Sequence, residues 1–180
     1  IIPHPPYTPL TTGAPMSRLT ATLALAALLT GSFTQAAEPE YVTIAMEIDV
    51  AKPAAEAWAK VGGYCDISKW ANLACEITSG DGGMGTVRVL DKGRVTEILV
   101  AHTELSYGYT QPVVEGTKYN LYHGFFEARP VTATSSKLLY TLVLDASVYA
   151  DQTTREADLL RRRTSFEARL VTMKTLVEAP

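Results

Sequence analysis

The sequence predicts an α+β fold in which a strongly curved antiparallel sheet of about seven strands is wrapped around a long C-terminal helix. Three observations predict it: an alternating strand followed by two short helical segments, six further strand-like segments, and a final helix with an apolar stripe. The predicted order is therefore β-α-α-β6-α. No crossover helix separates the six later strands, and parallel neighbours would need one. Short turns rich in Gly, Asp and Ser instead predict antiparallel hairpins.

The first strand is predicted over 41–50, because apolar and polar residues alternate there with the period of a half-buried strand. Its apolar face comprises Ile44, Met46, Ile48 and Val50. Pro53 suits the first turn of a helix, where its missing N–H costs nothing. Good helix formers continue over 54–61, and the glycine pair that follows ends the helix. A second short helix is predicted over about 66–73.

The later elements are one run of strands and a closing helix. The strands are predicted over 75–79, 86–90, 95–102, 105–111, 118–131 and 136–146. The helix is predicted over about 151–177, with Asp151 as its N-cap. Apolar residues recur along this helix at three- and four-residue steps and form one continuous stripe. The stripe comprises Leu159, Phe166, Leu170, Met173 and Val177.

Residues 1–15 contain five prolines and no charged residue. Proline fixes φ and lacks a backbone donor, so this stretch is expected to form neither helix nor sheet. It ends just before Met16, which we interpret as the true start of the protein. The upstream residues are then a non-native segment or the product of a mis-set start codon.

Residues 16–37 have the pattern of a secretory signal peptide. Arg18 supplies a short basic region, an apolar run of 11 residues follows over 19–29, and small residues lead to a cleavage site near Ala36 or Ala37. The run is too short for a bilayer, which takes about 20 residues. An ordinary buried helix is the alternative, but the run shows no amphipathic period.

The mature chain is therefore predicted to be one α+β domain over 38–180. It is expected in the periplasm or outside the cell. Ser32 stands where a bacterial lipoprotein would carry its lipidated cysteine, so we expect no lipid anchor and no stable membrane insertion. Hydrophobic residues make up 47% of the chain and charged residues 19%, a normal globular balance. The net charge of -3 and the scattered basic residues argue against a nucleic-acid partner.

Export decides how the two cysteines are interpreted. In an oxidising compartment an isolated pair such as Cys65 and Cys75 usually bridges. Two free buried thiols are one alternative. A zinc site with His102 and His123 is another, although no Cys-x-x-Cys or His-x-x-x-His spacing is present. We expect neither a metal nor a cofactor.

Gly80, Gly82 and Gly85 match the spacing of a dinucleotide-binding fingerprint. That fingerprint works only when a helix follows, because the N-terminus of the helix holds the pyrophosphate. Here the strand-like residues of 86–90 follow. The glycines are therefore interpreted as a hairpin turn.

The element order and several local motifs resemble the START-like helix-grip superfamily, also called the SRPBCC or polyketide cyclase/dehydrase group. The motifs are Pro53–Trp58 after the first strand, the glycine-rich turn at Gly80–Arg88, Val95–Glu97, Ser106–Tyr109 and Tyr122–Gly124. The similarity covers about 41–178. It specifies the superfamily well and any single activity weakly.

The resemblance implies a cavity between the sheet and the C-terminal helix. Carrying over the inward positions of the family gives the expected ligand-binding residues: Arg88, Leu90, Glu97, Leu99, Tyr107, Tyr109, Tyr122, Phe126, Tyr140, Leu142 and Phe166. The tyrosines among them offer a large apolar surface and a hydroxyl that can orient a ligand.

Charged groups in the chain leave alternatives open. Arg88 and Glu97 can form a buried pair that meets a ligand, a purely structural pair, or outward-facing charges. A glutamate in an apolar pocket can also act as an acid. His123 should face away from the cavity by alternation. The residues of 161–163 are interpreted as a solvated helix face paired with Glu156, Asp158 and Glu167, or as an anionic-lipid contact.

Three functions follow from these expectations. The first is a non-catalytic carrier or sensor of a small hydrophobic molecule or lipid, which we favour. The second is a cyclase, dehydratase or hydrolase on such a molecule, with Glu97 as acid/base and Arg88 or a tyrosine stabilising charge. The third is an accessory module whose cavity is filled by Tyr107, Tyr122 and Phe126. The ligand and the oligomeric state are not specified by the sequence.

Overall fold

The structure, a computed structural model, describes residues 38–112 and 121–180. The predicted upstream segment and signal peptide, over 1–37, lie outside the described residues. So do the first residues of the strand predicted over 118–131. All helices and strands named for this fold lie in the described part of the chain.

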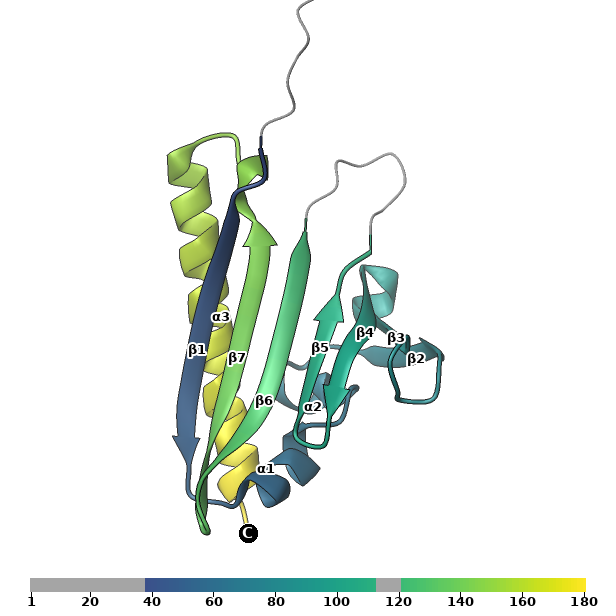
Figure 1. The fold of residues 1–180 in the computed structure, drawn as a ribbon, viewed down its shortest axis with the longest axis vertical. Helices are drawn as coiled ribbons and strands as arrows, with labels where there is room; N and C mark the ends of the chain where they lie inside the picture. Colours follow the sequence, from purple (N-terminus) through teal and green to yellow (C-terminus); the bar gives the residue numbers. More distant parts are fainter. Residues whose placement is uncertain (1–37, 113–120) are drawn as a thin grey trace, which may run out of the picture. The chain divides into compact units, whose positions relative to one another are not determined.

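The elements follow the predicted order (Figure 1). The strands are β1 (Tyr41–Val50), β2 (Cys75–Ser79), β3 (Val87–Leu90), β4 (Val95–Thr103), β5 (Ser106–Thr110), β6 (Tyr122–Thr132) and β7 (Ser135–Asp145). The helices are α1 (Ala54–Val61), α2 (Ile67–Trp70) and α3 (Gln152–Glu178), and short 3-10 turns η1 (Asp91–Gly93) and η2 (Ala146–Val148) follow β3 and β7. Helix α2 is shorter than predicted, because Asn72 adopts a left-handed backbone with φ 52°. Pro53, predicted in the first turn of α1, instead occupies the N-cap position just before it, without a side-chain capping bond.

All seven strands form one antiparallel sheet in the order β1-β7-β6-β5-β4-β3-β2. The later strands are joined as consecutive hairpins, as the short turns predict. The first strand pairs with the last, with Tyr41 opposite Asp145 and Val50 opposite Ser136. This pairing leaves β1 at the edge of the sheet, where α3 packs against it.

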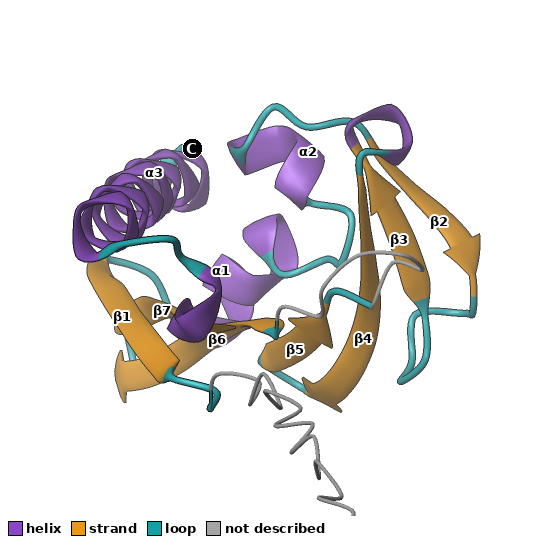
Figure 2. Cartoon of the chain, turned by 90° about the horizontal axis from the view of Figure 1, so that it is seen from above, coloured by secondary structure: helices purple, strands orange, loops and turns teal. Residues whose placement is uncertain are grey.

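The sheet bends, and the three helices lie on its concave side (Figure 2). Helix α3 packs on β1 and β7, α1 packs on β6 and β7, and both short helices contact α3. The strand register shifts within β2, β4 and β6, which are positions where an extra residue increases the local bend. The sheet therefore confirms the predicted α+β fold with a sheet curved around the C-terminal helix.

The side of the interior next to α1 and α2 is filled by aromatic rings. Trp58 of α1 stacks on Phe126 with 5.3 Å between ring centroids, and Phe126 stacks on Tyr140 at 5.6 Å. Trp70 of α2 meets the ring of Tyr140 edge-on. Tyr140 also lies 4.6 Å from the ring of Phe166 on α3. These contacts join all three helices to the sheet through one aromatic cluster.

The predicted faces of the outer elements are largely as expected. Ile44, Met46 and Val50 of β1 are buried. Four residues of the α3 stripe are buried, namely Phe166, Leu170, Met173 and Val177, while Leu159 is half-buried. Asp151 caps α3, and its side chain accepts a hydrogen bond from the backbone N–H of Thr154 at 2.8 Å.

A disulfide joins Cys65 and Cys75 across a sequence separation of 10 residues. It excludes the free-thiol and zinc alternatives for these cysteines. Helix α2 lies within the closed loop, so the bridge ties α2 to the start of β2. Among the described helices, none is long and apolar enough to cross a membrane.

The glycine-rich segment is the turn between β2 and β3. Gly80, Gly82 and Gly85 have φ values of 89°, 101° and 87°, which favour glycine. A Cβ on Gly80 would lie 2.6 Å from the Cα of Thr86. A strand, not a helix, follows this turn, so the hairpin interpretation is confirmed.

Candidate functional site

A cavity of about 360 Å³, called here the first cavity, lies between α3 and strands β3 to β6, with α2 beside it. Its apolar lining comprises Ile67, Leu73, Leu90, Val95 and Phe166. Its uncharged polar and aromatic lining comprises Tyr109, Gln111, Tyr122 and Ser165. The charged lining comprises Glu97, Arg94, Arg161, Arg162 and Arg169. The lining of the first cavity thus combines five apolar side chains with four uncharged polar or aromatic ones and five charged ones.

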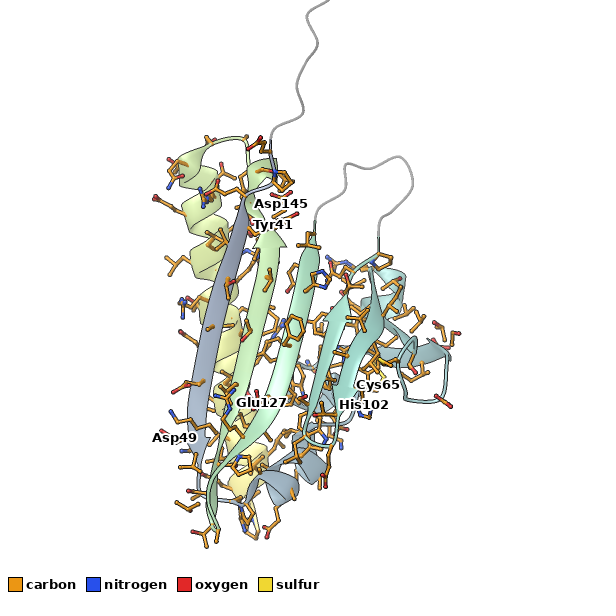
Figure 3. All side chains as sticks on the ribbon, in the orientation of Figure 1. Tyr41, Asp49, Cys65, His102, Glu127 and Asp145 are labelled. Atoms are coloured by element: carbon orange, nitrogen blue, oxygen red, sulfur yellow. A yellow bond between two sulfur atoms is a disulfide. The ribbon has the colours of Figure 1, made fainter. Side chains whose placement is uncertain are left out.

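A second cavity of about 330 Å³ lies between α1, the loop after it and the β4–β5 hairpin. Its lining includes Trp58, Tyr64, Asp66, Leu99, His102 and Tyr107. His102, labelled in Figure 3 near the β4–β5 hairpin turn, is exposed and lines this cavity at its edge. The described part thus holds a space between the sheet and α3, where the resemblance implies a cavity, and a further space beside α1.

Arg88 and Glu97 form a buried ion pair between the two cavities. They are register partners on β3 and β4, and alternation turns both side chains to the concave side. The Nε and Nη2 of Arg88 donate to Oε2 of Glu97 at 2.8 and 2.6 Å. Arg88 is 0% exposed and Glu97 3% exposed. The alternative of outward-facing charges is thus excluded.

Aromatic rings surround the guanidinium of Arg88. Its Cζ lies 4.1 Å from the ring centroid of Tyr64, 5.0 Å from that of Tyr109 and 5.6 Å from that of Tyr107. Its Nη1 donates to the carbonyl of Tyr64. Burial lowers the pKa of Arg88, but the electrostatic effects of Tyr107 and then Glu97 outweigh it and raise that pKa overall. Arg88 therefore stays charged in the interior.

The wall between the cavities consists of this ion pair and its tyrosines. Glu97 and Tyr109 line the first cavity, whereas Tyr64 and Tyr107 line the second. The two carboxylate oxygens of Glu97 have different partners. Oε2 is held by Arg88, while Oε1 accepts a 3.3 Å hydrogen bond from Nε2 of Gln111, which also lines the first cavity. Glu97 thus offers one oxygen on the side of the first cavity.

Two tyrosines of the sheet, Tyr109 on β5 and Tyr140 on β7, join their hydroxyls behind this wall. The hydroxyls of Tyr109 and Tyr140 lie 2.9 Å apart and are buried. Burial raises the pKa of both phenols well above the ordinary value. Both tyrosines therefore remain neutral hydrogen-bonding groups at any pH at which the fold persists.

Arginines of α3 form the other side of the first cavity. Arg161 and Arg162 share Asp158, with Arg162 Nε donating to Asp158 Oδ2 at 2.6 Å. Burial raises the pKa of Asp158, but hydrogen bonds from Tyr149, Arg162 and Arg161 outweigh it and hold that pKa well below the ordinary range. Asp158 is therefore a permanent anion between the two arginines.

All eleven residues expected to line the cavity are buried on the concave side. Leu90, Glu97, Tyr109, Tyr122 and Phe166 line the first cavity. Leu99 and Tyr107 line the second cavity. The remaining four, Arg88, Phe126, Tyr140 and Leu142, line neither of these two spaces and belong to the wall or the aromatic core. Whether any of them contacts a ligand stays a prediction.

The arginine triplet is only partly the solvated face that the sequence predicts. Arg163 does pair with Glu167 at 3.3 Å and also donates to the carbonyl of Ala45. Arg162, in contrast, turns to the first cavity, where its Cζ lies 5.2 Å from the ring centroid of Tyr122. Glu156 accepts from Gln152 rather than from an arginine, so its predicted pairing with the triplet is wrong.

The sequence interpretation missed Arg162, Arg169 and Gln111 as cavity residues. A signal for the two arginines was present, because they stand four residues before and three residues after Phe166 and so share its helix face. Gln111 follows the end of β5 and carries no such signal. His123 lies beside the exposed Phe125, 6.5 Å between ring centroids, on the outer side as expected.

Within residues 38–112 and 121–180, no group of three or more His, Cys, Asp or Glu is placed to hold a metal ion.

The sequence model of the family described as "Polyketide cyclase / dehydrase and lipid transport" matches residues 41–178, from the start of β1 to the end of α3. The chain belongs to this family. The predicted membership of the helix-grip superfamily is thereby confirmed. No curated protein matches the chain.

Solved structures with the same fold support the polyketide cyclase/dehydrase and lipid transport assignment at the level of architecture. The Zhui aromatase/cyclase from Streptomyces sp. R1128 is 16% identical, with a TM-score of 0.59 over 77% of this chain and 94% of that one. Truncated norcoclaurine synthase from Thalictrum flavum is also 16% identical, with a TM-score of 0.57 over 81% and 99%. Ara h 8.0201 is 18% identical, with a TM-score of 0.56 over 77% and 98%. Identities this low establish the helix-grip fold alone.

Proposed function

We propose that this protein binds a small hydrophobic molecule in the first cavity and acts as an exported carrier or sensor. The observation that carries the proposal is the first cavity itself. Its volume of about 360 Å³ falls near the lower end of the ~300–1,000 Å³ of small-molecule sites. Five apolar side chains line it together with polar and charged groups from β4, β5, β6 and α3, so it can meet both the apolar part and a polar group of a bound molecule.

The polar groups at the first cavity are held in place before any ligand arrives. Glu97 is fixed by Arg88, and Tyr109 is fixed by Tyr140. A preorganised site does not spend binding free energy on ordering its own side chains. The third alternative, a filled cavity, applies to the aromatic cluster around Phe126 but not to the space beside Tyr122.

Export is part of the proposal. The Cys65–Cys75 disulfide is typical of oxidising compartments and supports a periplasmic or extracellular location. The signal-peptide pattern of residues 16–37 points the same way. Expression of the full chain in an exporting host, followed by sequencing of the N-terminus of the mature protein, tests this part. An uncleaved cytosolic product would contradict it.

Native mass spectrometry of the purified chain tests binding. We expect a bound small molecule that is released on denaturation and can be identified by its mass. Ser165→Phe, which fills the first cavity, should abolish this adduct. Thr164→Phe is the matched control, because Thr164 is the exposed neighbour on the same helix. Equal adducts in both variants would place the ligand elsewhere and contradict the proposal.

A second candidate is an enzyme of the cyclase, dehydratase or hydrolase type. One observation favours it: Oε1 of Glu97 lies on the cavity side while Oε2 is paired with Arg88. A carboxyl group held at a cavity can serve as a general acid or base. Glu97 would then accept a proton from the bound molecule, with Tyr109 next to it as a hydrogen-bond donor.

The mass of the bound small molecule distinguishes the carrier from the enzyme. Glu97→Gln in a carrier should retain the compound that the wild-type chain retains. In a dehydratase the variant should instead trap the unreacted substrate, which is heavier by one water than the product retained by the wild type. In a hydrolase it should trap the uncleaved substrate, which is heavier than either of the two products. Thermal unfolding of the variant checks that it is folded before its adduct is compared.

A further inference from the structure

We infer that the ligand of the first cavity is an amphipathic anion, whose acidic group is held by Arg162 and Arg169 on α3 while its apolar body lies against Leu90 and Phe166. The inference rests on the proposed function and narrows it to one class of ligand. The class comprises hydrophobic molecules that carry one carboxylate, sulfonate or phosphate group.

Helix geometry places the two arginines on the cavity. They flank Phe166 at four residues before and three residues after it, and residues at these spacings share one helix face. Both line the first cavity and are half-buried. The Cζ of Arg162 lies 5.2 Å from the ring centroid of Tyr122, and the Cζ of Arg169 lies 4.4 Å from that of Phe166. The rings thus hold both guanidiniums at the rim of an apolar space.

The charges around the first cavity do not balance. Arg94 pairs with Asp91, and Arg161 and Arg162 share the single carboxylate of Asp158. Arg169 makes no ion pair with any residue of the described part.

The one acid in the lining does not restore the balance, because Glu97 is already neutralised by Arg88. The four arginines of the lining therefore face two partner carboxylates, which leaves an excess of two positive charges. A partly desolvated cation without a partner is unfavourable, and a bound oxoanion relieves it with charge-assisted hydrogen bonds.

Both arginines and Tyr122 line the first cavity. Burial raises the pKa of the Tyr122 hydroxyl, Arg162 lowers it, Glu97 raises it, and Arg169 lowers it by a smaller amount. Tyr122 comes from β6, opposite the helix. An oxoanion beside Tyr122 would meet two guanidiniums and one hydroxyl donor. This arrangement favours an anion, because each of the three groups can donate and the two guanidiniums also carry positive charge.

A pair of fluorescent probes tests the inference on the full chain. 8-Anilinonaphthalene-1-sulfonate and N-phenyl-1-naphthylamine share the same ring system, but only the first carries an acidic group. We expect the sulfonate probe to bind more tightly. Arg169→Gln should weaken its binding by about tenfold, as expected for loss of one charged hydrogen bond, and change binding of the neutral probe by no more than about twofold.

Arg163→Gln is the matched control, because Arg163 lies on the same helix but contacts Glu167 and the carbonyl of Ala45 instead of the first cavity. It should leave both affinities unchanged. Equal affinity of the two probes, or an equal loss in Arg163→Gln and Arg169→Gln, would overturn the inference while the proposed function stands. Failure of both probes to bind would overturn the proposed function as well.

Competition identifies the source of the anion. Decanoate should displace the sulfonate probe, whereas decanol and inorganic phosphate at the same concentration should not. Displacement by inorganic phosphate as effective as that by decanoate would assign the arginines to a free oxoanion. That result would overturn the claim that the ligand is amphipathic.

Discussion

The ring of Tyr109 lies against Gly124, its register partner on the neighbouring strand β6. A Cβ on Gly124 would stand 2.2 Å from Cζ of Tyr109 and 2.3 Å from its hydroxyl oxygen. The ring therefore occupies the space that any side chain at position 124 would need. Because the hydroxyl of Tyr109 is also bonded to Tyr140, the ring cannot swing aside without losing a buried hydrogen bond.

Gly124→Ala is accordingly expected to destabilise the protein by about 1–3 kcal/mol, the usual cost of overpacking a core. Denaturant unfolding at neutral pH measures it. Gly83→Ala is the control, because its nearest contact would be an ordinary 3.4 Å and its φ is not positive. Tyr109→Leu combined with Gly124→Ala should cost less than the sum of the two single changes. Strict additivity would show that the ring and the glycine do not interact as described.

The ion pair between Arg88 and Glu97 predicts strong coupling. Glu97→Leu alone leaves a guanidinium buried without its carboxylate and should cost about 3–5 kcal/mol, whereas Arg88→Met with Glu97→Leu removes both charges and should cost far less. A double-mutant cycle of unfolding free energies measures the coupling. Independent losses from the two single changes would mean that the pair contributes nothing as a unit.

Buried tyrosines predict unfolding at alkaline pH. Burial raises the pKa of Tyr64, Tyr107, Tyr109, Tyr122 and Tyr140 in the folded state. A raised pKa contributes stability that is fully present below the unfolded value of about 10 and is lost as pH rises above it. Absorbance at 295 nm and near-ultraviolet circular dichroism, followed together, should show these phenolates appearing only as the fold is lost. Their ionisation with an intact near-ultraviolet signal would contradict the burial.

The disulfide predicts sensitivity to reduction. Cys65 and Cys75 close a short loop, so the bridge should stabilise the protein by roughly 2–3 kcal/mol through the chain entropy of the unfolded state. Unfolding of the wild-type chain with and without a thiol reductant measures the difference. The Cys65→Ser/Cys75→Ser variant should match the reduced wild type and should not respond to the reductant. A response in that variant would assign the effect to something other than the bridge.

Element types and inward faces were predictable from the sequence, because each depends on local periodicity. Alternation along β1 predicts that Ile44 and Met46 are buried, and the i, i+3 and i+4 steps of α3 predict the same for Leu170. The residues that follow Gly85 are strand-like, which was enough to identify the turn. The neighbouring Cys65 and Cys75 were correctly paired on the expectation of an oxidising compartment.

Only the tertiary structure decided what the interior contains. A cavity is the space left after side chains from several elements have packed, so its place depends on rotamers and distances that no local pattern encodes. Phe126 and Tyr122 both face inward from β6, yet Phe126 fills the core against Trp58 while Tyr122 borders open space. The sequence places Arg162 in a triplet of arginines that is typical of a solvated helix face. Only the packing of α3 on the sheet shows that Arg162 lines the first cavity. Local sequence patterns thus determine which face of each helix or strand is buried, whereas the cavities between the elements depend on how those elements pack.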